Sequence, residues 1–378
     1  MSIVEDVNTT GTDTRPTLTQ DTIDAMVRML VDTFEGKKRL ILMNDLANLL
    51  QAEKLCVHLS AAIKTYSSPY SQVVLADRNS PEDEVPFLRY GRYKNGDPDI
   101  EICNLTNLKT DADVAVLITP RYDTVYTTME LLRQLVQQCN GTVHILIMFG
   151  SFLTKDRRDT PGEIATGPRM VSELMGILKT GNGKGRMLIV DPHSLQTITT
   201  DGGREAIIEA MPTLILAMLE GENVSIDRVA FVFSDGGAAK RYGSAIEKVG
   251  GKHCVQLTCN KIRTSEGTTS TLGDGGKSAK MLANKTVFVI DDMVRSGGTL
   301  VDAVGHIVLA GVSVEHIAVG VVHYDPVGEP HIRLANAGVR KLYVTDSNSD
   351  VVASAALVEM LSVVPIASVV ANALMSGL

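Results

Sequence analysis

The residues best suited to chemistry lie in one short stretch, Thr286–Leu300, which reads TVFVIDDMVRSGGTL. Apolar residues lead to two adjacent carboxylates, Asp291 and Asp292, and a turn with Gly297 and Gly298 follows. Glycines let backbone N–H groups approach a phosphate, and the start of a following helix favours an anion. Paired carboxylates suit ribose hydroxyls or a hydrated Mg²⁺. The stretch therefore predicts a cradle for a sugar phosphate.

The elements that must position this stretch follow from the pattern around it. Residues 286–290 are β-branched or aromatic, which is typical of a strand buried on both faces of a parallel sheet. In open α/β sheets, ligands bind where the carboxyl end of a strand turns into a helix. The rest of the chain alternates in the same way, with predicted strands at 39–43, 114–119, 142–149, 186–190, 228–233, 253–260, 316–322 and 341–345.

This alternation predicts an α/β protein with mainly parallel sheets flanked by helices. One sheet with so many strands would be large, so we expect two halves that divide near residue 203. The intervening helices are predicted at 21–34, 45–63, 124–138, 167–179, 204–219, 238–249 and from about 365. A Thr/Ser/Gly-rich flexible loop is predicted at 264–278.

Length and composition exclude several classes of protein. The chain has 378 residues, enough for two domains. Its net charge of −8 argues against a general affinity for nucleic acid or anionic membranes. Five scattered cysteines without a CxxC pair indicate a reducing compartment, and the sequence pattern leads us to expect neither a signal peptide nor a membrane-spanning run. We therefore expect a cytoplasmic globular protein.

Other charged residues follow predicted strands. They are Lys155, Asp156 and Arg157 after the strand that ends in Phe149-Gly150; His193 in the string MLIVDPHS; Asp235 in SDGG; and Lys261 and Arg263 at the start of the predicted loop. Taken singly, each is more often a solvated surface group or a packing histidine than part of a site.

Taken together, however, and in their order along the chain, these motifs resemble those of the ribose-phosphate pyrophosphokinase (phosphoribosyl pyrophosphate synthetase) family. DDxxxxGGTL resembles the phosphoribosyl-pyrophosphate loop that this family shares with type I phosphoribosyltransferases, and Lys261-Ile262-Arg263 is similar to the K-x-R of the synthetase's catalytic loop. The resemblance implies two type I phosphoribosyltransferase-like domains, at 39–203 (ATP side) and 204–364 (ribose-phosphate side). It also implies an N-terminal extension at 1–38 with one helix, and a C-terminal helix, 365–378, that completes the first domain.

Roles for individual residues come from the resemblance alone. It implies that Lys261 and Arg263 are catalytic and stabilise the transferring diphosphoryl group. It implies ribose and phosphate binding by Asp291, Asp292, Arg295, Ser296, Gly297, Gly298 and Thr299. It implies ATP binding by Tyr93, Asn95, Asp97, Lys155, Asp156, Arg157 and His193, and Mg²⁺ binding by His193 and Asp235.

The implied activity is the Mg²⁺-dependent transfer of the β,γ-diphosphate of ATP to ribose 5-phosphate, by a homo-oligomer between a dimer and a hexamer. Arg295-Ser296 stands where the family has D-T, and the added positive charge fits an acceptor with a second phosphate. One alternative is therefore transfer to ADP-ribose, as in the synthetase-like enzymes of phage NAD⁺ rebuilding. Two others are a non-catalytic, synthetase-associated regulatory subunit and a base-adding phosphoribosyltransferase.

Overall fold

The computed structural model describes residues 38–44, 70–75, 87–94, 98–103, 112–119, 125–158, 160–194, 205–264, 267–272, 276–348 and 359–376. All of them belong to a single unit, Lys38–Leu378. The helices predicted at 21–34 and 45–63, together with Asn95 and Asp97, lie outside the described residues.

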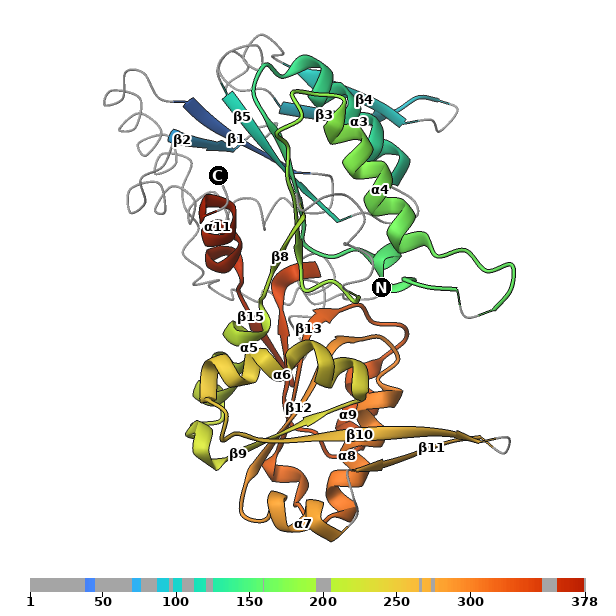
Figure 1. The fold of residues 1–378 in the computed structure, drawn as a ribbon, viewed down its shortest axis with the longest axis vertical. Helices are drawn as coiled ribbons and strands as arrows, with labels where there is room; N and C mark the ends of the chain where they lie inside the picture. Colours follow the sequence, from blue (N-terminus) through green and yellow to red (C-terminus); the bar gives the residue numbers. More distant parts are fainter. Residues whose placement is uncertain are drawn as a thin grey trace, which may run out of the picture. The chain divides into compact units, whose positions relative to one another are not determined.

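Among the described residues, a six-stranded parallel sheet has the strand order β2-β1-β5-β6-β7-β8 (Figure 1). Its strands are β1 (Lys38–Asn44), β2 (Tyr70–Leu75), β5 (Ala112–Ile118), β6 (Val143–Ile147), β7 (Met187–Val190) and β8 (Glu205–Ile208). β5, β6 and β7 are buried along their whole length, which explains their nearly continuous apolar sequences. A separate antiparallel ribbon consists of β3 (Phe87–Arg92) and β4 (Pro98–Cys103).

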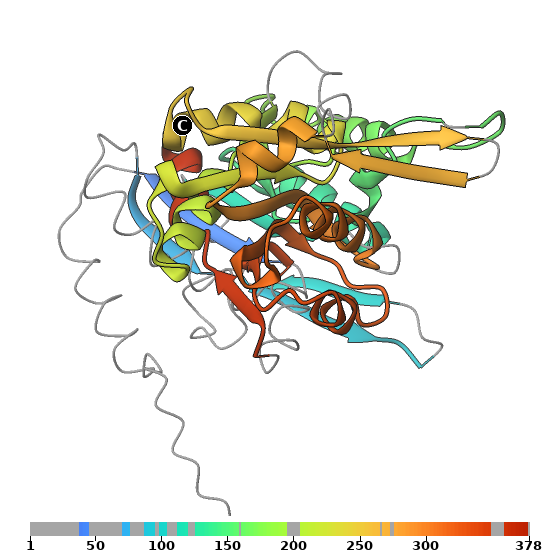
Figure 2. The same ribbon diagram turned by 90° about the horizontal axis from the view of Figure 1, so that it is seen from below.

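A second sheet of seven strands has the order β11-β10-β9-β12-β13-β14-β15. Its strands are β9 (Val229–Phe233), β10 (Val255–Thr264), β11 (Gly267–Leu272), β12 (Thr286–Val294), β13 (Ile317–Tyr324), β14 (Leu342–Thr345) and β15 (Leu361–Val364). All neighbours pair in parallel except β10 and β11, which form an antiparallel hairpin that is visible in both views (Figures 1 and 2).

Helices flank both sheets. They are α3 (Val125–Gln138), α4 (Thr166–Lys179), α5 (Met211–Gly221), α6 (Gly236–Gly250), α7 (Gly276–Leu282), α8 (Gly298–Leu309), α9 (Pro330–Asn336) and α11 (Ala367–Ser376). Short 3₁₀ turns lie at η2 (Ser151–Thr154), η4 (Ile226–Arg228), η5 (Val314–His316) and η6 (Asp346–Asn348). None of the described helices has the length and apolar character needed to cross a bilayer.

Side-chain alternation along the strands divides the interior into layers. One face of the first sheet packs with α3 and α4. One face of the second sheet packs with α8 and α9. The remaining faces of both sheets contribute to one continuous core, together with α5, α6 and α11. These layers confirm the predicted α/β class with mainly parallel sheets flanked by helices.

Two predicted elements were wrong. The predicted helix at 204–219 is strand β8 followed by α5, whose first turn contains Pro212, a residue that suits a helix start. The predicted loop at 264–278 contains β11 and the start of α7. The boundary near residue 203 and the role of the C-terminal helix stay predictions. β8 nevertheless pairs with β7, and α11 contacts β8.

Candidate active site

Asp291 and Asp292 lie near the carboxyl end of β12, in the middle of the second sheet. The strand is flanked by β9 and β13, and its register places Ile290 opposite Phe233 and Asp291 opposite Val321. The apolar residues before the acids are completely buried, so the two carboxylates are held at a fixed edge of the sheet. α8 starts a few residues later, as the Gly-rich turn predicts.

Asp292 is the centre of a cluster of charged side chains. His193 Nδ1 lies 2.5 Å from Asp292 Oδ2, and Arg241 Nη1 lies 2.8 Å from the same oxygen. Burial opposes ionisation of Asp292, but the hydrogen bond to His193 and the charge of Arg241 outweigh it and hold its pKa well below the usual range. Asp292 is therefore ionised at neutral pH and accepts a hydrogen bond from His193 Nδ1.

Asp291 has the opposite tendency. Burial and the negative charge of Asp292 raise the pKa of Asp291 well above its usual range. Two adjacent carboxylates that interact this closely titrate as a pair, so the first proton comes off easily and the second is held. Arg241 lies beside this pair and balances the negative charge of Asp292.

His193 reaches Asp292 from the first sheet, where it follows β7. The turn before it contains Asp191, which is buried and has a positive φ of 33°. Its Oδ2 accepts hydrogen bonds from the backbone N–H groups of Ala210 (2.6 Å) and Met211 (3.3 Å) at the start of α5. Burial raises the pKa of Asp191 to about 7, although these two hydrogen bonds act to lower it. The uncommon backbone conformation of Asp191 is thus held in place by the hydrogen bonds from its side chain to the start of α5.

A second contact between the two sheets supports the same turn. His323 Nε2, at the end of β13, lies 3.0 Å from the carbonyl oxygen of Asp191, and its Nδ1 lies 2.8 Å from Ser347 Oγ. Burial lowers the pKa of His323, so the ring is neutral. Because a carbonyl can only accept, Nε2 carries the ring proton and Nδ1 accepts from the Ser347 hydroxyl. The His323 ring also packs on Phe149, with centroids 5.1 Å apart.

The turn predicted to bind phosphate has the expected backbone form. Gly297 has a left-handed φ of 79° directly before α8, a conformation that glycine adopts at little cost. Ser296 is exposed, and Gly298 and Thr299 are half-buried at the start of α8. Arg295 Nε donates to Asp325 Oδ2 at 2.8 Å, and the N–H of Val327 bonds to the Arg295 carbonyl at 3.2 Å. The loop after β13 therefore supports the turn.

The predicted metal ligands are not grouped around a preformed site. Asp235 caps α6, and its Oδ1 accepts from the backbone N–H groups of Gly237 (2.9 Å) and Ala238 (3.0 Å). Within the described residues, no group of three or more His, Cys, Asp or Glu side chains is arranged to hold a metal ion. Mg²⁺ commonly binds through one or two carboxylates together with substrate phosphates and water, so Asp235 suits an ion that arrives with a nucleotide, whereas a metal-binding role for His193 rests on the resemblance alone.

The other predicted residues lie on three separate segments. Lys155, Asp156 and Arg157 follow η2; Lys155 pairs with Glu163 at 2.5 Å, Asp156 is half-buried and Arg157 is exposed. Lys261 and Arg263 lie on the β10–β11 hairpin, opposite Ser270 and Thr268. Tyr93 follows β3 and is 60% exposed. The structure brings His193 to Asp292, and the assigned roles of all these residues stay predictions.

Three residues near this site were missed by the sequence argument: Arg241, Asp191 and His323. Arg241 is in the second turn of a helix, where nothing in the local sequence shows that it faces a carboxylate from another element. Asp191 and His323 each end a buried strand, and that position could have indicated them.

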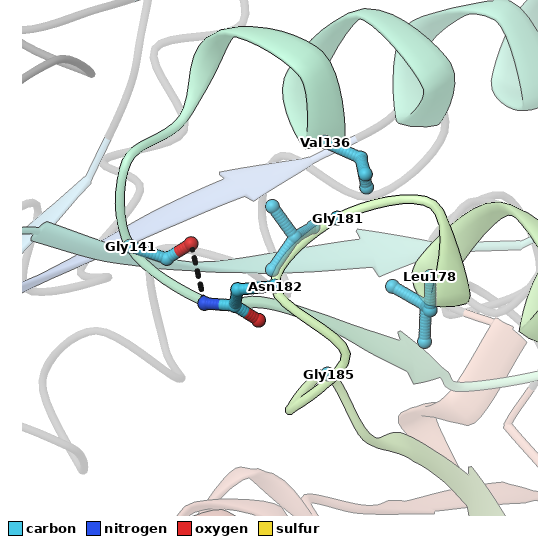
Figure 3. Close-up of a pocket in the computed structure, with 7 residues that line it drawn as sticks. Val136, Gly141, Leu178, Gly181, Asn182 and Gly185 are labelled. Atoms are coloured by element: carbon cyan, nitrogen blue, oxygen red, sulfur yellow. Dashed lines mark hydrogen bonds between the residues drawn. The ribbon is translucent and has the colours of Figure 1, made fainter.

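A surface hollow lies elsewhere, between the ends of α3 and α4 and the starts of β6 and β7 (Figure 3). It is lined by Val136, Gly141, Val143, Leu178, Gly181, Asn182 and Gly185, and Asn182 Nδ2 donates to the Gly141 carbonyl at 3.0 Å. These residues lie at the amino ends of strands of the first sheet, whereas His193 follows the carboxyl end of β7, and they include no titratable side chain.

Comparison with known proteins shows which proteins this chain resembles. Residues 235–350 match the phosphoribosyl transferase domain. The chain is 22% identical over 226 residues to the chloroplastic ribose-phosphate pyrophosphokinase 3 of Oryza sativa subsp. japonica, covering 58% of this chain and 51% of that protein. It is 24% identical over 205 residues to the ribose-phosphate pyrophosphokinase of Sulfolobus acidocaldarius, covering 54% of this chain and 65% of that protein.

The alignment thus spans about half the length of the plant relative. A crystal structure of phosphoribosylpyrophosphate synthetase from Mycobacterium smegmatis has the same fold, with a TM-score of 0.68 and 18% identity over 89% of this chain and 97% of that one. The domain match, these relatives and the shared fold support a relationship between this chain and the ribose-phosphate pyrophosphokinases.

Proposed function

We propose that this protein transfers the β,γ-diphosphate of ATP to the anomeric hydroxyl of ribose 5-phosphate, giving phosphoribosyl pyrophosphate and AMP. The observation that carries the proposal is the contact between His193 and Asp292 at 2.5 Å. His193 belongs to the motif predicted for the nucleotide, and Asp292 to the motif predicted for the ribose. Diphosphoryl transfer requires these two half-sites to be adjacent.

In this mechanism the residues near β12 bind the acceptor. Asp291 and Asp292 accept hydrogen bonds from the ribose hydroxyls, and the turn from Ser296 to Thr299 receives the 5-phosphate. The anomeric oxygen forms a bond to the β-phosphorus while the bond to the α-phosphate oxygen breaks, and the hydroxyl proton is released. No covalent enzyme intermediate is needed, because catalysis consists of positioning and charge stabilisation.

The nucleotide side is proposed to use the remaining predicted residues. Lys261 and Arg263 stabilise the charge on the transferring group, and residues 155–157 bind the triphosphate. Mg²⁺ bound to the ATP phosphates would be held by His193 and Asp235 and would neutralise negative charge on the phosphates. Tyr93, Asn95 and Asp97 stay predictions for the adenine, as do a homo-oligomeric assembly and a cytoplasmic location.

The alternative acceptor, ADP-ribose, was suggested by Arg295 as an additional positive charge. Arg295 is paired with Asp325 at 2.8 Å, so its charge is already balanced within the protein. This ion pair favours ribose 5-phosphate as the acceptor and makes ADP-ribose the second candidate.

The test is to incubate the full chain with ATP and Mg²⁺ in the presence of ribose 5-phosphate, ADP-ribose or neither, and to quantify AMP. We expect AMP formation that depends on ribose 5-phosphate. AMP formed only with ADP-ribose would make the second candidate correct. A folded protein that forms no AMP with either acceptor would contradict the proposal and favour a regulatory subunit.

A further inference from the structure

Arg241 has a position in the site that no motif indicated. It lies in α6, its side chain is only 15% exposed, and its Nη1 is 2.8 Å from Asp292 Oδ2. Its guanidinium also lies over the ring of Tyr242, with its carbon 5.5 Å from the ring centroid. Tyr242 is completely buried, so the guanidinium packs on a fixed surface.

Arg241 and His193 converge on the same oxygen atom. Oδ2 of Asp292 is 2.8 Å from Arg241 Nη1 and 2.5 Å from His193 Nδ1. Arg241 comes from α6 in the second half of the chain, whereas His193 follows β7 in the first half. A carboxylate between a fixed guanidinium and an imidazole has one favourable side-chain orientation, and the imidazole orientation then follows from it.

We propose that Arg241 is a positioning residue that orients His193 through Asp292 and thereby aligns the nucleotide with the acceptor. The inference rests on the proposed function and adds to it a residue that acts through its contact with Asp292. If Arg241 only stabilised the fold, its replacement would lower stability without changing the state of the His193 ring. A buried ion pair alone is weak support for a stabilising role, because desolvation offsets much of the attraction.

The experiment compares Arg241→Gln and Arg241→Lys with Lys240→Ala in the full chain. Lys240 is the preceding residue of α6 and is exposed, which makes it a matched control. Two quantities are measured: kcat for AMP formation, and the ¹⁵N NMR signals of the His193 ring, identified by their loss in His193→Gln. Thermal unfolding shows which variants are folded.

We expect Arg241→Gln to shift the His193 signals and to lower kcat about 10–100-fold, the range for residues that orient a functional histidine. Lys240→Ala should change neither. Arg241→Lys should give a smaller change in both quantities, because lysine retains the positive charge. Some change should remain, because an ammonium cannot reproduce the planar contact with Tyr242. Unmoved His193 signals with kcat within about twofold of wild type would overturn the inference.

The experiment also decides the matter if Arg241→Gln is unfolded or if the wild-type chain is inactive. If Arg241→Gln does not fold, Arg241→Lys retains the charge and carries the test, and wild-type values for both quantities would overturn the inference. If the wild-type chain forms no AMP with either acceptor, the proposed function fails, but the His193 signals still report whether Arg241 orients the ring.

Discussion

His193 Nδ1 lies 2.5 Å from Asp292 Oδ2, although 99 residues separate them in the chain. Each residue stands near the carboxyl end of a strand, and the two strands belong to different sheets. Ligands of α/β proteins bind at such ends. A ligand that needs groups from both sheets would therefore bind beside this contact, near the carboxyl ends of β7 and β12.

Removing one partner of the Asp292–Arg241 pair should be strongly destabilising, even though the intact pair adds little net stability. Asp292→Asn would leave a buried guanidinium without its countercharge, and we expect a loss of about 3–5 kcal/mol in the free energy of unfolding. Asp325→Asn is the control, because its partner Arg295 is 40% exposed and exposed pairs contribute less than about 1 kcal/mol. Denaturant titration measures both, and equal losses would contradict the prediction.

Asp191 should make stability fall as pH rises. Its pKa is raised to about 7 in the folded protein from the usual 3.8, so the unfolded chain loses this proton first. The stabilisation that the protonated Asp191 carboxyl contributes is fully present below about pH 4 and is lost as pH rises towards 7. A difference of one pKa unit between the folded and unfolded states corresponds to about 1.4 kcal/mol in the free energy of unfolding. Asp191→Asn keeps an oxygen that can accept from the backbone and should remove this dependence.

The measurement for Asp191 is the melting temperature of both proteins from pH 4 to pH 8. Other groups titrate in both proteins, so the difference between the two curves isolates this residue. A constant difference over that range would show that Asp191 does not titrate there.

His144 should be a source of instability. It is buried in β6, and neither ring nitrogen has a hydrogen-bond partner among the residues that the structure describes. Burial lowers its pKa to about 4, so wild-type stability falls as pH drops from about 6.5 through 4. His144→Leu should stabilise the protein by about 1–3 kcal/mol, because two unpaired polar atoms are removed.

The gain from His144→Leu should increase between pH 7 and pH 5, and denaturant unfolding at the two pH values checks it. His316→Leu is the control, because His316 is exposed and should change stability by less than about 0.5 kcal/mol. A loss of stability in His144→Leu at both pH values would show that the ring contributes packing that leucine cannot replace.

Lys261 should be required for catalysis and not for folding. If it stabilises the transferring diphosphoryl group, Lys261→Ala should lower kcat by about 100-fold or more, with little change in melting temperature. Lys252→Ala removes the same charge from an exposed position before β10 and should retain activity. AMP formation at saturating substrates is the measurement, and near-wild-type activity in Lys261→Ala would remove this residue from the mechanism.

Much of the fold followed from local sequence. The apolar strands were identified because burial on both faces requires continuous apolar residues, and the turn at Gly297 because glycine adopts a positive φ. The β10–β11 hairpin was missed because Thr268, Thr269 and Ser270 lack an apolar alternation. β8 was missed because a four-residue strand gives little periodicity, although Pro212 marked the helix start.

The candidate site was predictable only in part. Asp291 and Asp292 were indicated by their position after an apolar strand, and His193 by its place in an order of motifs that resembles the synthetases. Arg241 was not, because its importance depends on a contact with a residue 51 positions later, from 241 to 292. Nor could sequence show that Arg295 is paired with Asp325.

The core that both sheets share has a consequence for biosynthesis. It contains Leu40 from β1 and Leu374 from α11, so residues near opposite ends of the sequence belong to the same apolar cluster. During translation the first sheet is made long before α11 leaves the ribosome. Its inner face stays uncovered for most of that time, and such exposed apolar surface is prone to aggregation. Nascent chains of this protein should therefore depend on chaperones until α11 has been synthesised.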